Sequence, residues 1–145
     1  MTDDEQRNHL DAMYPVGEKQ PGHVQTRSGR PLSDLNLDNL LAGHVTTSDF
    51  AITAEGLRLQ AEIAEQAGRP NLAQNLRRGA ELVEIPDNVL LEVYELLRPG
   101  RAQSADDLRA VANRLRGTYG AKETASLLDE AALVYERRGV FQPRF

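Results

Sequence analysis

The chain has 145 residues, a length that suits one domain of ordinary size, and its mean hydropathy is −0.51. Its net charge is −5, with acids and bases mixed along the sequence, which argues against a protein that binds duplex nucleic acid through a basic face. It contains no cysteine, so disulfides, thiol nucleophiles and cysteine-ligated metals are excluded.

The same sequence argues against membrane insertion and secretion. No apolar run approaches the roughly 18 residues that a membrane-spanning helix needs. The first ten residues, MTDDEQRNHL, are acidic and polar, unlike a secretory signal. We therefore expect a cytoplasmic protein.

Residues 1–33 are predicted to form an extended N-terminal arm, because Pro and Gly recur there without a periodic apolar pattern. Its apolar side chains are too sparse to build a core and are suited to anchoring the arm on a partner. They are Met13, Tyr14, Val16, Val24 and Leu32. We expect residues 14–33 to become ordered only on that partner. A solvated terminus is an equally open alternative. Residues 34–145 are predicted to form a helical domain.

Two short helical segments are expected at the start of the helical domain. One begins near Asn36, covers LDNLLA and ends at Gly43, a residue type that favours helix ends. In the other, Thr47 and Ser48 are candidate caps for a turn that runs through Phe50.

The first long helix is predicted to run from about residue 54 to residue 67. Thr53 is a suitable N-cap, and Gly68 is a suitable stop. Its apolar side chains cover a wide arc, which indicates neighbours on two sides. They are Leu57, Leu59, Ala61, Ile63, Ala64 and Ala67.

Two more helices are bounded by prolines. Pro70 suits the first position of one helix, Pro86 separates it from the next, and Pro99 ends that helix. The expected inward stripe of the first comprises Leu72, Ala73, Leu76, Ala80 and Val83. That of the second comprises Val89, Leu90, Val93, Leu96 and Leu97.

The last two helices carry the strongest terminal signals. Ser104 and Asp107 have the spacing of a capping box, and Gly120 suits the C-terminal end of that helix. The last helix covers about residues 121–138, before Gly139. Its two seams comprise Ala125, Leu128, Ala132 and Tyr135, and Leu127, Ala131 and Val134. The predicted fold is therefore all-α: a small helical bundle of about five main helices with short connections.

No group of residues in the sequence has the pattern of an active site. The histidines His9, His23 and His44 are scattered, and none has a second histidine three or four positions away. A metal site built on His44 and Asp49 is conceivable, but histidines this isolated are usually polar surface. No nucleophilic triad and no glycine-rich phosphate loop are evident. We therefore predict no catalytic, cofactor-binding or metal-binding residue in this chain.

Carboxylates and arginines occur in pairs along the helices. The acidic pairs are Glu62 and Glu65, Glu81 and Glu84, Asp106 and Asp107, and Asp129 and Glu130. Paired carboxylates perform acid–base chemistry when burial separates their pKa values. Here they lie beside arginines, a pattern typical of solvated ion-pair lattices. The arginine pairs Arg77–Arg78 and Arg137–Arg138 are conceivable anion-binding patches, but we expect them to interact with Glu81, Glu84 or a helix C-terminus.

A family resemblance rests on ITAEGLRLQAEIAEQAGRPNLAQNLRRGAEL, followed by IPDNVLLEVYELLRPGR. It continues through SADDLRAVANRLRGTYGAK and EAALVYERRG. These stretches resemble the small (gamma) subunit of coenzyme B12-dependent diol and glycerol dehydratases. The resemblance extends over nearly the whole chain.

The resemblance implies a place in a dimer of heterotrimers that also contains large and medium dehydratase subunits. In that family, adenosylcobalamin is bound by the other subunits and starts the radical dehydration of 1,2-diols to aldehydes. The small subunit is implied to be a structural support, and no catalytic residue of the family maps onto this chain. The chain would thus be part of a hydro-lyase without supplying its chemistry.

Two other classes of function remain open from the residues alone. A free-standing helical adaptor would use the same apolar surfaces and N-terminal arm to bind an unrelated protein. A small hydrolase would need a concave site with perturbed carboxylates.

Overall fold

The computed structural model describes residues 12–141, and these residues form an all-α protein. Residues 1–11 and 142–145 lie outside the described part, so the first third of the predicted arm, with His9, is not covered. No strand is present between residues 12 and 141; one isolated antiparallel bridge joins Gln25 and Pro31. The predicted fold class is thereby confirmed.

The chain consists of two compact units, residues 1–80 and residues 81–145. The boundary falls inside one long helix, α5 (Pro70–Glu84), which begins in the first unit and ends in the second. The division at residue 33, between an arm and a helical domain, remains a prediction.

The described part of the arm, from residue 12, folds into short turns, where an extended arm was expected. It contains helix α2 (Val16–Lys19) and the 3-10 turns η1 (Pro21–His23) and η2 (Leu32–Asp34). The prolines and glycines that break longer helices also support such turns, each closed by local backbone hydrogen bonds. Met13 is buried even though the arm has few apolar residues.

Two short elements follow the arm. Helix α3 (Leu37–Leu41) begins where it was predicted, and its N-cap is Asn36, whose side chain accepts a hydrogen bond from the backbone N–H of Asn39. The 3-10 turn η3 (Thr47–Phe50) is capped by Thr46, so the prediction that Thr47 or Ser48 caps it is wrong. Thr46 is the residue with an acid at the right spacing, because Asp49 completes a capping box with it.

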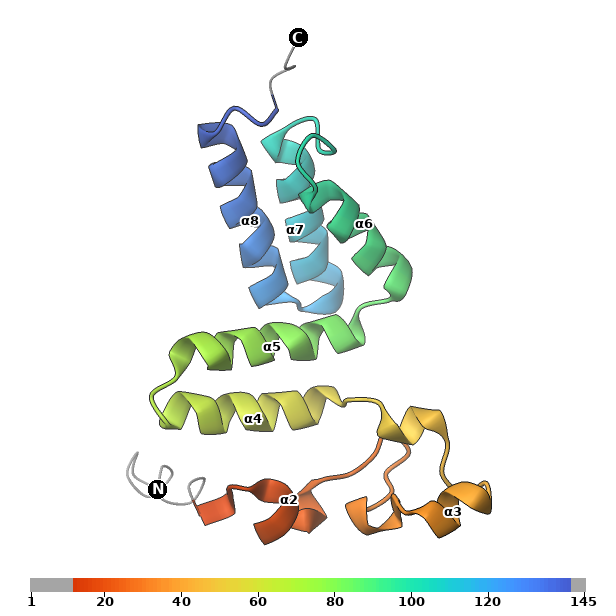
Figure 1. Cartoon of the computed structure of the whole chain (residues 1–145). Helices are drawn as coiled ribbons and strands as arrows, with labels where there is room; N and C mark the ends of the chain where they lie inside the picture. The colour runs from red at the N-terminus through yellow and green to blue at the C-terminus, as the bar shows by residue number, and fades with distance from the viewer. Residues whose placement is uncertain (1–11, 142–145) are drawn as a thin grey trace. The chain divides into compact units, whose positions relative to one another are not determined.

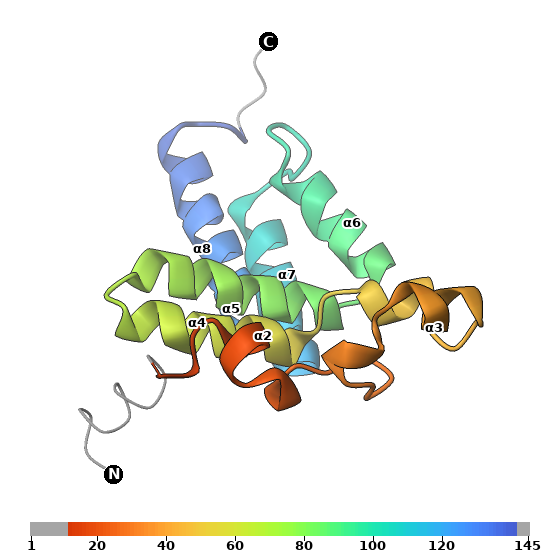
Figure 2. The same ribbon diagram turned by 60° about the horizontal axis from the view of Figure 1, so that its bottom comes forward.

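Helix α4 (Ala54–Gln66) and the first part of α5 run side by side in the first unit (Figures 1 and 2). Thr53 caps α4 as predicted, accepting a hydrogen bond from the Gly56 N–H at 3.1 Å. Small side chains allow the two helices to approach closely. The cluster between them comprises Ala61, Ala64 and Ala73, with Leu76 packed against it. Leu72 was expected in this stripe but is 44% exposed.

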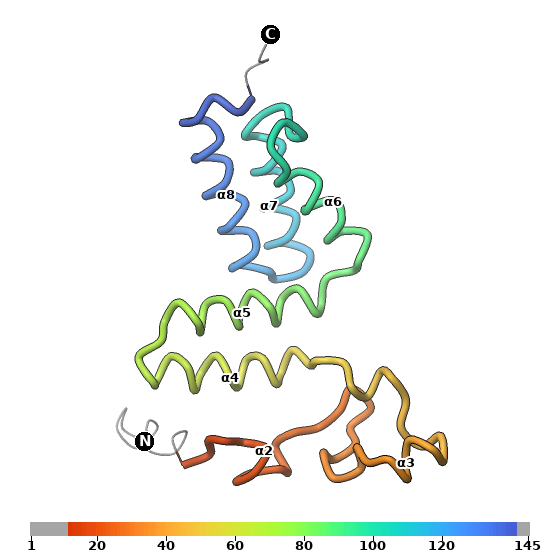
Figure 3. Tube along the Cα trace, in the orientation of Figure 1, coloured from red at the N-terminus to blue at the C-terminus, as the bar shows by residue number. Residues whose placement is uncertain are grey.

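Helices α6 (Asp87–Leu97), α7 (Ala105–Tyr119) and α8 (Lys122–Arg137) build the second unit, and their chain path is followed in Figure 3. The predicted stripes are partly confirmed: Val89, Val93, Ala125 and Leu128 lie in the core, whereas the second predicted seam of α8 is only half-buried. The core comprises Ile85, Val89, Val93, Val111, Ala112, Leu115, Ala121, Ala125 and Leu128. The completely buried leucines are those of α7 and α8. These two helices therefore carry the tightest packing of the unit.

Local end signals fix helix α7. The side chain of Ser104 accepts a hydrogen bond from the backbone N–H of Asp107, and Asp107 accepts one from the N–H of Ser104. At the other end Gly120 has a φ of +64°, the left-handed conformation that glycine adopts without strain. Both ends agree with the predicted caps.

Candidate functional site

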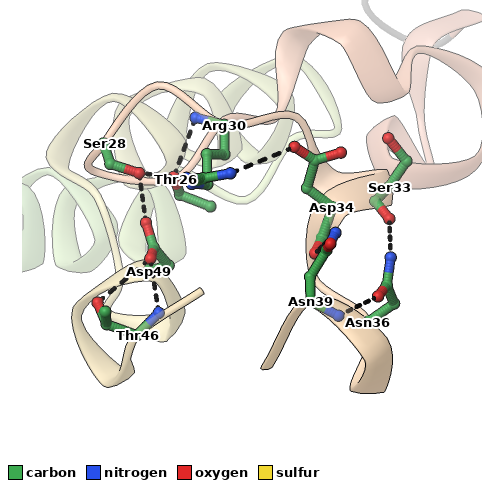
Figure 4. A network of polar contacts seen from close by, with 9 residues as sticks. All are labelled: Thr26, Ser28, Arg30, Ser33, Asp34, Asn36, Asn39, Thr46 and Asp49. Carbon is green, nitrogen blue, oxygen red and sulfur yellow. Dashed lines mark hydrogen bonds and ion pairs between the residues drawn. The ribbon is translucent and has the colours of Figure 1, made fainter. Parts of the chain in front are cut away.

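A polar network centred on Asp49 holds the arm against turn η3 within the first unit (Figure 4). One carboxylate oxygen of Asp49 accepts a short hydrogen bond from the Ser28 hydroxyl. The other accepts hydrogen bonds from the backbone N–H of Thr46 at 2.9 Å and from its hydroxyl at 3.2 Å. Thr26 joins the network through its contact with Ser28, 3.0 Å between hydroxyl oxygens, and accepts from the Arg30 N–H at 3.1 Å.

These donors stabilise the ionised form of Asp49. The hydrogen bond from Ser28 and that from the Thr46 backbone lower the pKa of Asp49 from 3.8 to about 2. An acid–base catalyst needs a pKa near the working pH. Asp49 is therefore suited to holding the loop in place and unsuited to donating a proton at neutral pH.

A second group of polar contacts, also drawn in Figure 4, fixes helix α3. Asn36 donates to the Ser33 carbonyl at 3.0 Å, and Asn39 donates to the Asp34 carbonyl at 3.0 Å. A helix of five residues is too short to be stable by itself. These side-chain contacts with the backbone hold α3 in place without burying any residue of it.

The consequence is a leucine face that is open to solvent. Leu37, Leu40 and Leu41 stand three and four positions apart, so they share one side of α3. Their side chains are 66%, 43% and 78% exposed. We call these three residues the α3 leucine face. An exposed apolar face on a helix held in place by polar contacts makes this segment the candidate interaction surface.

Two apolar grooves lie in the first unit. One, of about 240 Å³, is lined by Leu32, Leu35, Phe50 and Ile52 among others. The other, of about 690 Å³, lies between the start of the arm and helices α4 and α5. Its apolar lining comprises Tyr14, Val16, Ile63, Ala64, Ala67, Leu72 and Leu76. Neither groove contains a cluster of convergent charged groups of the kind that chemistry requires.

In the second unit, Glu81 caps the start of helix α8, although it lies more than forty residues earlier in the sequence. Its carboxylate accepts hydrogen bonds from the backbone N–H groups of Glu123 and Thr124, at 2.8 and 2.7 Å. It also accepts one from the Thr124 hydroxyl at 2.7 Å. The prediction that Glu81 pairs with Arg77 or Arg78 is wrong, because free N–H groups at a helix start compete for the same carboxylate.

The other predicted ion-pair lattices are partly confirmed. Arg77 pairs with Glu65, Arg116 with Asp129, and Arg109 with both Asp106 and Glu136. The hydrogen bonds from Arg109 to Glu136 and to Asp106 raise the pKa of the guanidinium. All these side chains are more than a third exposed, so each pair contributes little stability. Asp107 instead serves in the capping box of α7.

The conceivable metal pair does not form a site. The carboxylate of Asp49 already accepts hydrogen bonds from Ser28 and Thr46, and the side chain of His44 is exposed. Across residues 12–141, no three His, Asp or Glu side chains come together to hold an ion. Within the same residues, no helix is both long enough and apolar enough to cross a membrane.

Comparison with known proteins identifies the family. The family described as dehydratase small subunit matches residues 10–142, nearly the whole chain. The chain belongs to the dehydratase small-subunit family. This dehydratase subunit is 46% identical over 125 residues to the propanediol dehydratase small subunit of Citrobacter freundii. It is 45% identical over 125 residues to that of Salmonella typhimurium (strain LT2). Both alignments cover 86% of this chain and 72% of the relative.

Family membership confirms the resemblance noted in the sequence. A small subunit of a dehydratase has other subunits as partners, so its exposed apolar surfaces are candidate contacts with those subunits. Sequence reasoning missed the α3 leucine face, although three leucines at helical spacing between polar caps were a visible signal. It also missed the Glu81 cap, for which the local sequence carries no signal.

Proposed function

We propose that this chain is a structural, non-catalytic subunit of an adenosylcobalamin-dependent propanediol or glycerol dehydratase of the cytoplasm. The observation that carries the proposal is the 46% identity, over 125 residues, with a propanediol dehydratase small subunit. In this proposal, large and medium subunits bind the cofactor and the diol, and two copies of each subunit form a dimer of heterotrimers.

The features of the first unit support an assembly role. The carboxylate of Asp49 accepts hydrogen bonds that hold the arm and turn η3 together, and the lowered pKa of Asp49 keeps that group ionised at neutral pH. The apolar side chains of α3 are presented to solvent on a short helix that polar caps hold in place. A rigid polar frame with an exposed apolar centre is what a protein-binding surface requires.

The proposed function is tested by assembly. The chain is co-expressed with large and medium subunits of a propanediol dehydratase, and the complex is purified through a tag on the large subunit. We expect the three chains to elute together, with a native mass of two copies of each and aldehyde formation that depends on adenosylcobalamin. Elution of this chain as a free species, while the other two form an active complex, would refute the proposal.

A further inference from the structure

We propose that the α3 leucine face is a docking site for another dehydratase subunit, and that the docking surface on that subunit is apolar with a basic rim. This inference rests on the proposed function, because it assumes that the partner is a subunit of the same enzyme. It goes further in naming the contact surface on this chain and the chemistry of the surface that it meets.

The first argument concerns what holds α3 in place. Most helices in globular proteins are stabilised by burying an apolar face. Helix α3 buries none of its residues, and its cap is built from hydrogen bonds of Asn36 and Asn39. The shape of this segment therefore does not depend on burying its leucines. They are held ready in a fixed geometry, which lowers the entropic cost of binding.

The second argument concerns charge. The sequence has no Lys or Arg between Arg30 and Arg58. Arg30 lies 3.8 Å from Asp34 and is thus already paired. Asp38, on α3 itself, is exposed and has no ion-pair partner among residues 12–141. Residues 31–57, the segment that contains the leucine face, carry the four acids Asp34, Asp38, Asp49 and Glu55 and no Lys or Arg. This excess of negative charge favours a complementary surface that carries Arg or Lys around an apolar centre.

The inference is tested by competition for assembly. The wild-type chain and the double variant Leu37→Asn, Leu41→Asn are expressed together with the other two subunits. The complex is purified through the large subunit. Mass spectrometry of the variant peptides then gives the ratio of the two chains in the complex relative to that in the lysate. We expect the variant to be depleted about 100-fold, tenfold for each buried leucine.

Matched control variants in the second unit test whether the depletion is specific to substitutions on α3. Leu91→Asn with Leu133→Asn changes two leucines that are 65% and 56% exposed in the second unit, and we expect it to enter the complex at nearly the input ratio. Asp38→Lys should be depleted about threefold or more, whereas Glu130→Lys on α8, with the same change in charge, should not be. Equal depletion of variant and control, in either pair, would overturn the assignment to α3.

The outcomes separate this inference from the proposed function. If the wild-type chain is absent from the purified complex, the proposed function itself fails. If the wild-type chain assembles and the α3 double variant assembles equally well, only the docking site is wrong. The thermal unfolding midpoints of the free variants check their folding. If the double variant is destabilised, Leu41→Asn alone, at the most exposed of the three positions, takes its place in the competition, with at least a tenfold depletion expected.

Discussion

At the residue scale, two carboxylates, those of Asp49 and Glu81, hold separate parts of the chain in place by accepting hydrogen bonds. Asp49 binds hydroxyl and backbone donors of the arm and of its own turn, within the first unit. Glu81 binds the first N–H groups of α8, within the second unit. Both carboxylates accept hydrogen bonds from N–H or O–H groups that would otherwise lack a partner, and an unpaired donor lowers the stability of the fold.

Removing the Glu81 cap should destabilise the second unit. We expect Glu81→Ala to lower the free energy of unfolding by about 1–2 kcal/mol, because it exposes the N–H groups of Glu123 and Thr124. Urea unfolding followed by circular dichroism measures the change. Glu130→Ala, at an exposed position on α8, serves as the control and should stay within about 0.5 kcal/mol of wild type. Equal effects of the two substitutions would show that the cap contributes nothing.

Asp49 should make stability depend on pH in the acid range. Its pKa is about 2 in the folded chain against 3.8 ordinarily, so its hydrogen bonds stabilise the fold fully above pH 4. That contribution is lost as pH falls from about 4 towards 2, because the protonated acid no longer accepts from all its donors. Thermal unfolding between pH 2 and 7 should show this decline in wild type and a weaker one in Asp49→Asn. Parallel profiles would contradict the assignment.

At the element scale, glycine stabilises the end of helix α7 but destabilises its interior. Gly120 ends α7 with a φ of +64°, whereas Gly117 lies inside the helix with open space where a Cβ would stand. We expect Gly120→Ala to destabilise the chain by about 1 kcal/mol and Gly117→Ala to stabilise it by about 0.5–1 kcal/mol. Thermal denaturation of both variants measures this, and a shift in the same direction for both would contradict the account of α7.

The elements also show how far the sequence alone can reach. The caps at Thr53 and Ser104 and the stop at Gly120 were predictable, because each depends on residues within one helical turn. The Glu81 cap was not, since it joins residues that are far apart in the sequence. The exposure of Leu72 escaped prediction because a helical stripe shows which side chains share a face but not how far the neighbouring helix covers them.

For the α3 leucine face, the sequence predicted the helix but not the exposure of its leucines. The position of α3, beginning near Asn36, was predicted, but the sequence does not show that no other element among the described residues covers the three leucines. Exposure is a property of the tertiary structure, which the local pattern does not contain. The family resemblance, in contrast, was readable from the sequence, because it rests on the order of residues along nearly the whole chain.

At the scale of the whole molecule, the arm is expected to be ordered in two stages. Hydrogen bonds within the chain already tie residues 26–30 to Asp49, so the N–H groups of Thr26 and Arg30 should be protected in the free protein. The prediction that residues 14–33 become ordered only on the partner is therefore kept for residues 14–25 alone. Hydrogen exchange of the free and the assembled chain separates these stages. Equal protection of residues 14–25 in both states would contradict the second stage.

The central claim is that this chain supports a catalytic complex without supplying its chemistry. The most direct measurement is the rate of cobalamin-dependent aldehyde formation per large subunit, with this chain present and with it omitted from the co-expression. The account predicts that omission reduces both the recovered complex and its rate, and that the isolated chain has no activity. Full assembly and an unchanged rate without this chain would contradict it.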